Sequence, residues 1–172
     1  MVGRERRLKL LVVCLGNICR SPLAEGALRA RIAASPLVGR IEVDSAGTGD
    51  WHVGLPPDHR AVACARSHGV DIGSLRARQL CVADFDEFDW ILCADADNLR
   101  DVLCLAPAHA KGKVALLMEW AGVEPGLAVP DPYTGDAGDF KHVWDMVDGA
   151  ARALVEGRCP SADCGIIERS HD

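Results

Sequence analysis

Four short apolar segments, each followed by a stretch with helical spacing, constrain the fold of this 172-residue chain more than any other feature. The apolar segments are residues 8–13, 41–46, 90–94 and 113–117, and the helical stretches are 23–34, 58–68, 95–105 and 139–157. Strands that alternate with helices form a parallel sheet, and such a sheet is buried on both faces. The sequence therefore predicts an α/β fold in which helices cover both faces of a four-stranded parallel sheet.

The length of the chain predicts a single domain over residues 1–172. Apolar residues make up 49% of the sequence, which is enough for a substantial core. We expect that core to span about residues 8–157 and the tail, residues 158–172, to be loose. The tail cysteines Cys159 and Cys164 have no second pair that would complete a zinc site.

Charge and cysteine content narrow the possible partners. A net charge of -6 gives no indication of nucleic-acid binding. No run of apolar residues approaches the ~18 that a membrane span needs, so we expect no membrane span. Eight cysteines without a secretion signal are typical of reduced thiols, which favours a cytoplasmic location. No spacing typical of a metal site or a nucleotide-binding loop occurs, so we expect neither metal nor cofactor.

Residues 14–22, Cys-Leu-Gly-Asn-Ile-Cys-Arg-Ser-Pro, join the first predicted strand to the first predicted helix. Ser21 can cap that helix and Pro22 suits its first turn. A helix start presents unpaired backbone N–H groups that bind phosphate, and the same field favours a thiolate at Cys14. Arg20 offers a planar fork for two phosphate oxygens. A nucleophilic sulfur beneath a bound phosphate indicates covalent phosphoryl transfer.

The stretch from Cys14 to Pro22 resembles the signature loop of the low-molecular-weight protein tyrosine phosphatases. The resemblance extends over roughly residues 8–155. Further matching segments are Asp44-Ser45-Ala46, Pro56-Pro57-Asp58, His68-Gly69, Ala77-Arg78-Gln79, Ile91-Leu92-Cys93, Asn98-Leu99 and Asp131-Pro132-Tyr133. It implies hydrolysis of phosphotyrosine in proteins through a phosphocysteine intermediate, with inorganic phosphate as a product.

The resemblance also implies a role for each site residue. Cys14 would be the nucleophile, Arg20 would hold the phosphate, and Asp131, in a Pro/Gly-rich loop, would protonate the leaving phenolate. Trp51 and Tyr133 would form the walls of a slot for the phenyl ring, although Thr134 stands where many relatives carry a second aromatic residue. Ser45 and His68 would hold the loop in shape through hydrogen bonds. The remaining substrate-binding positions implied are Leu15, Gly16, Asn17, Ile18, Cys19 and Ser21.

A redox role is predicted for Cys19. If the loop curls around a phosphate, Cys19 lies beside Cys14 and can trap its sulfenic acid as a disulfide. Simple packing of Cys19 is the alternative.

Three other functions stay open. A protein-arginine phosphatase would share the fold, but such relatives tend to carry threonine where this chain has Ile18. A thiol-dependent arsenate reductase would need two further cysteines, and Cys93 and Cys104 have the wrong spacing. A non-catalytic phosphate-binding module would not need Cys14, Arg20 and Asp131 together. We therefore predict phosphotyrosine as the preferred substrate over phosphoserine, phosphothreonine and phosphoarginine.

Overall fold

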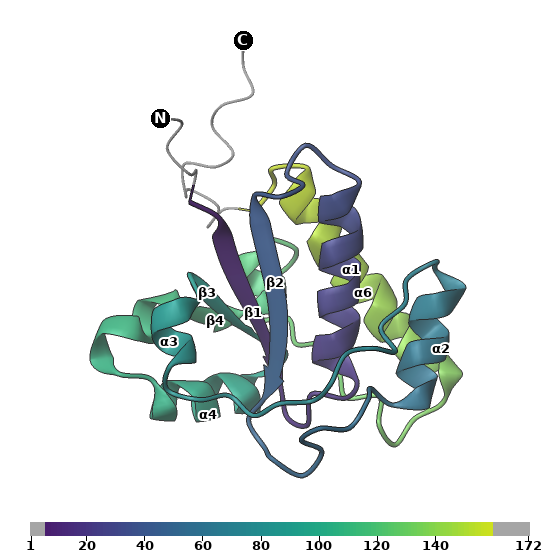
Figure 1. The fold of residues 1–172 in the computed structure, drawn as a ribbon, viewed down its shortest axis with the longest axis horizontal. Coiled ribbons are helices and arrows are strands. Elements are labelled where there is room, and N and C mark those ends of the chain that lie inside the picture. Colours follow the sequence, from purple (N-terminus) through teal and green to yellow (C-terminus); the bar gives the residue numbers. More distant parts are fainter. Residues whose placement is uncertain (1–5, 160–172) are drawn as a thin grey trace.

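The computed structural model describes residues 6–159 and contains one sheet of four parallel strands (Figure 1). The strands are β1 (Leu8–Cys14), β2 (Ile41–Gly47), β3 (Trp90–Cys93) and β4 (Val114–Leu116). Their order in the sheet is β2-β1-β3-β4, and each neighbouring pair is parallel. The predicted four-stranded parallel sheet is therefore confirmed.

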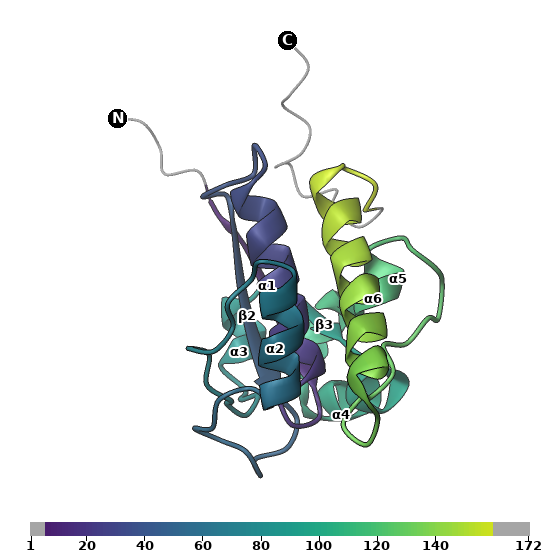
Figure 2. The same cartoon turned by 90° about the vertical axis from the view of Figure 1, so that its right-hand side faces the viewer.

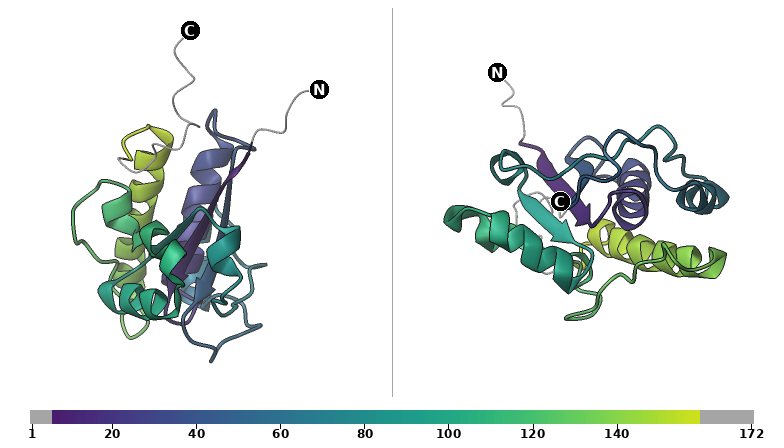
Figure 3. Two further views of the ribbon diagram at one scale, coloured as in Figure 1. Left: turned by 90° about the vertical axis from the view of Figure 1, so that its left-hand side faces the viewer. Right: turned by 90° about the horizontal axis from the view of Figure 1, so that it is seen from below.

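Helices cover both faces of the sheet, as predicted. In Figure 1, α1, α2 and α6 lie on one side of the sheet, and α3 and α4 lie on the other, while Figure 2 looks onto the layer of α1, α2 and α6. Figure 3, seen from below, shows the sheet between these two layers. Their bounds are α1 (Arg20–Ala33), α2 (His59–Ser67), α3 (Asp84–Glu87), α4 (Ala96–Leu105), α5 (Leu117–Trp120) and α6 (Ala137–Val155), with a 3-10 helix η1 (Ala108–Lys113) before β4.

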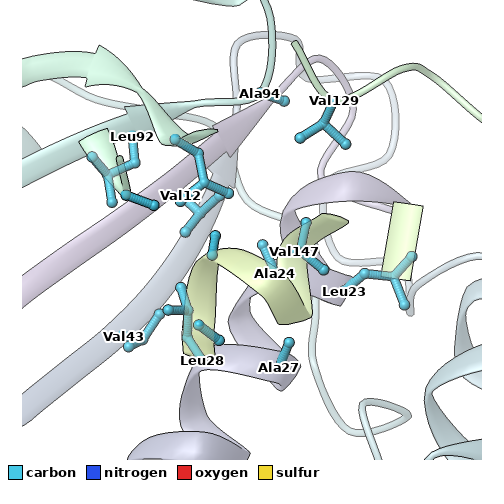
Figure 4. Close-up of a cluster of buried hydrophobic side chains, with 14 of the residues drawn as sticks. Val12, Leu23, Ala24, Ala27, Leu28, Val43, Leu92, Ala94, Val129 and Val147 are labelled. Carbon is cyan, nitrogen blue, oxygen red and sulfur yellow. The ribbon is translucent and has the colours of Figure 1, made fainter. Parts of the chain in front are cut away.

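The central strand β1 supplies side chains to two separate apolar clusters. Successive residues of a strand point to opposite faces. Leu10 and Val12 therefore pack with α1 and α6, whereas Leu11 and Val13 pack with α3 and α4. Figure 4 shows the first cluster, where Val12 lies among side chains of α1, β2, β3 and α6. Burial on both faces explains why β1 reads as a nearly continuous apolar run.

The observed starts of two helices match the starts predicted from the sequence, and the observed starts of two others differ from them. Asp58 and Asp95 cap α2 and α4 with their carboxylates, as predicted for Asp58 and consistent with the predicted start at Asp95. The last helix starts before the predicted Asp139, because Asp136 is its cap and Asp139 completes a capping box. The predicted cap by Ser21 is wrong. Helix α1 already begins at Arg20, and the Ser21 hydroxyl is turned towards Cys14.

Two further segments depart from the sequence prediction. The fourth strand is shorter than residues 113–117, because Leu117 begins the helical turn α5, which buries Met118 and Trp120. The tail was predicted to be loose from residue 158, but Cys159 is buried and its thiol donates to the Trp120 carbonyl. Cys164 lies outside the described residues. Within residues 6–159, no helix has the length and apolarity needed to cross a membrane.

Candidate active site

The loop between β1 and α1, residues 14–20, turns its carbonyl groups away from the adjacent pocket. The carbonyl oxygens of Cys14, Leu15 and Ile18 accept from the N–H groups of Thr48, Gly49 and Asp58, each at 2.9 Å. In a trans peptide the following N–H points the opposite way. Within the described part of the chain, the N–H groups of Gly16, Ile18 and Cys19 donate to no protein group. These N–H groups and the start of α1 form a cradle for an anion.

The end of β2 lies directly against this loop, and Gly47 makes the approach possible. A Cβ atom on Gly47 would lie 2.7 Å from the Leu15 oxygen and 3.1 Å from the Asn17 nitrogen, both backbone atoms. Asn17 itself has a left-handed backbone, with φ of 56°. The shape of the cradle therefore depends on a residue of the neighbouring strand as well as on its own sequence.

Cys14 lies at the base of the loop, with two hydrogen-bonding groups on its sulfur. The Ser21 Oγ is 3.0 Å from the sulfur, and the Asn17 backbone N–H donates to it at 3.3 Å. The Ser21 Oγ accepts from the Asn17 side chain at 2.8 Å, so its one hydrogen points either at the sulfur or at the Ala46 carbonyl, which is 3.5 Å away. Both groups therefore fix the position of the sulfur at the base of the loop.

A buried polar chain supports the loop from behind. The Asn17 amide also donates to Ser45 Oγ at 2.9 Å, and Ser45 Oγ donates to Glu25 Oε1 at 2.6 Å. The Asn17 side-chain oxygen, Oδ1, accepts from the Arg78 backbone N–H at 3.0 Å. Burial raises the pKa of Glu25, while the hydrogen bond from Ser45 acts in the opposite direction. Glu25 was not predicted, since a glutamate within a helix looks like a surface residue.

Arg20 is only 4% exposed and is held in place by residues far away in the sequence. Its Nη1 donates to Asp95 Oδ2 at 2.6 Å and to the Val129 carbonyl at 3.0 Å. Asp95 therefore orients Arg20 while its other oxygen caps α4. The sequence predicted Asp95 only as a helix start, because a cap and an ion-pair partner leave the same local signal.

A pocket of about 180 Å³ opens above the loop. Trp51 and Tyr133 stand at its rim, 68% and 50% exposed. A Cβ atom on Gly49 would lie only 1.9 Å from the Trp51 ring, so the absence of a side chain at Gly49 makes room for the indole. His52, which was not predicted, is also part of the wall. The pocket is lined by Cys14, Leu15, Gly16, Ile18, Cys19, Arg20, Trp51, His52, Asp131 and Tyr133.

Asp131 lies on the loop between α5 and α6, which we call the acid loop (residues 129–135). The Val129 N–H donates to the Ala94 carbonyl at the end of β3, at 2.8 Å. Asp131 Oδ1 accepts from the Tyr133 N–H at 3.0 Å, and its other oxygen is 3.8 Å from Arg20 Nη2. The carboxylate is half-exposed at the pocket, where a proton can be exchanged with a bound group.

Cys19 shares the pocket with Cys14, and both are free thiols. Burial, followed by the charge of Asp58, raises the pKa of Cys19 to about 12. The Cys19 thiol therefore stays protonated at neutral pH and is a poor nucleophile in the resting protein.

His68 is the one predicted site residue that the structure places elsewhere. It follows α2, where its ring Nδ1 lies 2.9 Å from the Cys64 carbonyl, and the ring stacks on Trp144 of α6 with 4.8 Å between ring centroids. The predicted hydrogen bond to the loop is therefore wrong. The loop is supported by residues 77–80 instead of by His68. This segment passes beside the loop, and its Arg78 backbone N–H donates to the Asn17 side chain.

A buried sulfur beneath a ring of backbone N–H groups, with an arginine and a carboxylate beside it, defines a thiol-based site for a phosphate group on an α/β fold. Residues 9–159 match the family model described as low molecular weight phosphotyrosine protein phosphatase. The chain is 42% identical over 149 residues to a putative low molecular weight protein-tyrosine-phosphatase of Synechocystis sp., covering 86% of this chain and 94% of that protein.

Solved structures agree with the sequence match. The protein tyrosine phosphatase from Entamoeba histolytica superposes with a TM-score of 0.81 at 35% identity, covering 88% of this chain and 99% of that one. Vibrio vulnificus Wzb, solved in complex with benzylphosphonate, superposes with a TM-score of 0.76 at 31% identity, covering 87% and 98%. The chain belongs to the low molecular weight phosphotyrosine protein phosphatase family.

Proposed function

We propose that this protein hydrolyses phosphotyrosine in other proteins, with Cys14 as the nucleophile. The observation that carries the proposal is the convergence of Cys14, Arg20 and Asp131 on one pocket above an anion cradle. Cys14 and Arg20 stand at the two ends of the 14–20 loop, whereas Asp131 comes from the acid loop, more than 100 positions further along the chain. Family membership supports the same reaction.

Two steps account for the reaction. In the first, the Cys14 thiolate attacks phosphorus while Arg20 and the backbone N–H groups stabilise the equatorial oxygens. The phosphorus–oxygen bond to tyrosine breaks, Asp131 gives its proton to the departing phenolate, and a phosphocysteine forms. In the second, Asp131 takes a proton from water, which attacks phosphorus and releases inorganic phosphate and the thiolate.

The pocket walls support phosphotyrosine as the substrate. Trp51 and Tyr133 offer aromatic faces to a phenyl ring, and such contacts contribute about 0.5–1.5 kcal/mol beyond the area they bury. The related Wzb structure holds benzylphosphonate, which also joins an aromatic ring to a phosphorus group. Ile18, which lines the pocket, offers no hydroxyl group to a guanidinium, so phosphoarginine is the less favoured substrate. We further propose a cytoplasmic location, supported by the free thiols of Cys14 and Cys19.

The arsenate reductase alternative loses support from the cysteines it would need. Cys93 is fully buried in β3, and burial raises its pKa to about 12, whereas Cys104 is exposed on α4. Neither residue lines the pocket that contains Cys14.

Turnover of matched peptides carrying each phosphorylated residue tests the substrate. We expect kcat/KM to be highest for phosphotyrosine, because the shorter side chains of phosphoserine and phosphothreonine cannot place phosphate on the cradle while reaching past Trp51 and Tyr133.

Cys14→Ser should abolish turnover. Asp131→Asn should slow phenyl phosphate hydrolysis by roughly 10²–10⁴-fold, the usual size of general acid catalysis. Turnover of phosphoarginine that equals or exceeds that of phosphotyrosine would contradict the proposal.

A further inference from the structure

Arg60, in the first turn of α2, binds the acid loop with its side chain. Its Nη2 donates to the Tyr133 carbonyl at 2.8 Å, and its Nη1 donates to the Gly135 carbonyl at 3.2 Å. The guanidinium also lies over two rings, 4.7 Å from the centroid of Phe140 and 5.7 Å from that of Tyr133. Arginine stacks on aromatic faces in this way, which fixes the plane of the guanidinium.

The same guanidinium is held from the other side by Asp58. Arg60 Nε and Nη2 donate to the two Asp58 oxygens at 3.0 and 2.9 Å. The carboxylate is only 9% exposed, and this pairing holds the pKa of Asp58 below its usual range. The Asp58 backbone N–H in turn donates to the Ile18 carbonyl of the 14–20 loop. Asp58 and Arg60 therefore join the anion cradle to the acid loop through one short chain of bonds.

Asp131 lies between two attachments of the acid loop. On one side, the Val129 backbone is bound to the Ala94 carbonyl and to Arg20. On the other side, the only side chain that donates to the carbonyls of Tyr133 and Gly135, within residues 6–159, is Arg60. A hydrogen bond between the Gly135 N–H and the Pro132 carbonyl makes residues 132–135 a single turn, so Arg60 holds the turn as one unit.

We propose that Arg60 is a positioning residue that sets the distance of Asp131 and Tyr133 from the anion cradle. Arg60 itself does not line the pocket above the cradle. Its effect reaches the reaction through the acid loop, because proton transfer from Asp131 depends on that distance. The inference rests on the proposed role of Asp131 as general acid.

Lysine cannot replace Arg60 in this position. Arg60 makes four hydrogen bonds in two directions with a flat, rigid group. An ammonium group is a point charge with three donors and no flat face to stack on Phe140. Arg60→Lys should therefore keep the charge near Asp58 and lose most of the hold on the acid loop.

The test compares two substrates. The leaving group of phenyl phosphate must be protonated as it departs, whereas the p-nitrophenolate leaving group of p-nitrophenyl phosphate depends much less on protonation. We use kcat/KM because it reports the first step, from free enzyme to phosphocysteine. Arg60→Met should lower kcat/KM about tenfold for phenyl phosphate and less than about threefold for p-nitrophenyl phosphate. Arg60→Lys should show the same split in a weaker form, and it serves as the second variant if Arg60→Met folds poorly.

A matched control separates positioning from general stability. Arg31 forms a similar forked pair with Asp148, with both contacts at 2.8 Å, between α1 and α6 and away from the pocket. Arg31→Met should lower the melting temperature without changing the ratio of kcat/KM between phenyl phosphate and p-nitrophenyl phosphate. An equal loss on both substrates in Arg60→Met, or the same split in Arg31→Met, would overturn the proposal.

A double variant excludes a simple charge effect. Arg60→Met removes the guanidinium that neutralises the Asp58 carboxylate near the pocket, where the remaining charge would repel a phosphate dianion. Asp58→Asn combined with Arg60→Met removes that charge while asparagine still caps α2. We expect the double variant to keep the larger loss of kcat/KM for phenyl phosphate than for p-nitrophenyl phosphate. Recovery of phenyl phosphate turnover would overturn the positioning role. Failure of the wild type to hydrolyse either substrate would instead contradict the proposed function.

Discussion

At the scale of single residues, the site depends on partners that hold its charged groups in fixed directions. Arg20 is almost completely buried, and a buried guanidinium needs hydrogen-bond acceptors in several directions. Asp95 and the Val129 carbonyl provide them. The remaining donors of the guanidinium then face the pocket, where a phosphate group would accept from them.

Asp95→Asn should therefore weaken the site without unfolding α4. Asparagine is as good a helix cap as aspartate, but it carries no charge to orient Arg20. Hydrogen bonds to charged groups contribute about 1.5–3 kcal/mol, so we expect kcat/KM to fall roughly 10–100-fold. The measurements are steady-state kinetics and thermal unfolding. A large fall in melting temperature with unchanged kinetics would contradict an orienting role for Asp95.

The raised pKa of Cys19 makes a prediction about oxidation that depends on pH. Mild peroxide should inactivate the enzyme reversibly through a Cys14–Cys19 disulfide. Because Cys19 has a pKa of about 12, its reactive thiolate increases as the pH rises, and closure of the disulfide should accelerate between about pH 6 and 9. Mass spectrometry of quenched samples measures the bond directly. Cys14 joined to another cysteine, or a closure rate independent of pH, would contradict this.

At the scale of secondary-structure elements, the contact of β2 with the 14–20 loop leaves no room for a side chain at the end of the strand. No room exists for a side chain on Gly47, because the nearest atoms belong to the backbone of the loop. A backbone cannot move aside as a flexible side chain does, so the cradle itself must shift if Gly47 is replaced.

Gly47→Ala should thus cost about 1–3 kcal/mol of stability and weaken phosphate binding, as expected for overpacking. Gly149→Ala in α6 is the matched control, since a Cβ atom there would meet nothing within 4 Å. It should increase stability by about 0.5–1 kcal/mol, the usual gain within a helix, and leave turnover unchanged. Thermal unfolding and inhibition by inorganic phosphate measure both effects. Unchanged phosphate inhibition in Gly47→Ala would show that the loop tolerates the change.

At the scale of the whole molecule, the phosphate site exists only in the folded chain. Its parts come from the β1–α1 loop, the start of α4 through Asp95, and the acid loop before α6. In the sheet order β2-β1-β3-β4, these segments meet at the carboxyl ends of adjacent parallel strands.

Inorganic phosphate should consequently raise the melting temperature. A ligand that binds only the folded state at ten times its Kd adds roughly 1.4 kcal/mol of stability, which corresponds to about 3–6 °C for a domain of this size. Cys14→Ser should retain the shift, because the backbone N–H groups and Arg20 remain. Arg20→Met should lose most of it. A full shift in Arg20→Met would show that phosphate stabilises the protein at another place.

The sequence by itself determined the features that depend on neighbours along the chain. Apolar runs predicted the four parallel strands, although α5 was hidden in the last one because its apolar residues continue the run. Acidic residues before apolar repeats predicted the starts of α2 and α4. The cysteine–arginine spacing after β1 predicted the cradle, because Cys14 to Arg20 are consecutive in the chain and directly precede a helix.

Only the tertiary structure decided which distant residues hold that cradle in shape. Asp95 binds Arg20 across 75 positions, and Arg60 binds Tyr133 across 73. His68 matched the family pattern but packs on Trp144 instead, and Glu25 turned out to be a buried support for Ser45. An ion pair or buried hydrogen bond of this kind leaves no periodic pattern in the sequence. Its free energy arises only when folding brings the two groups together and removes water from them.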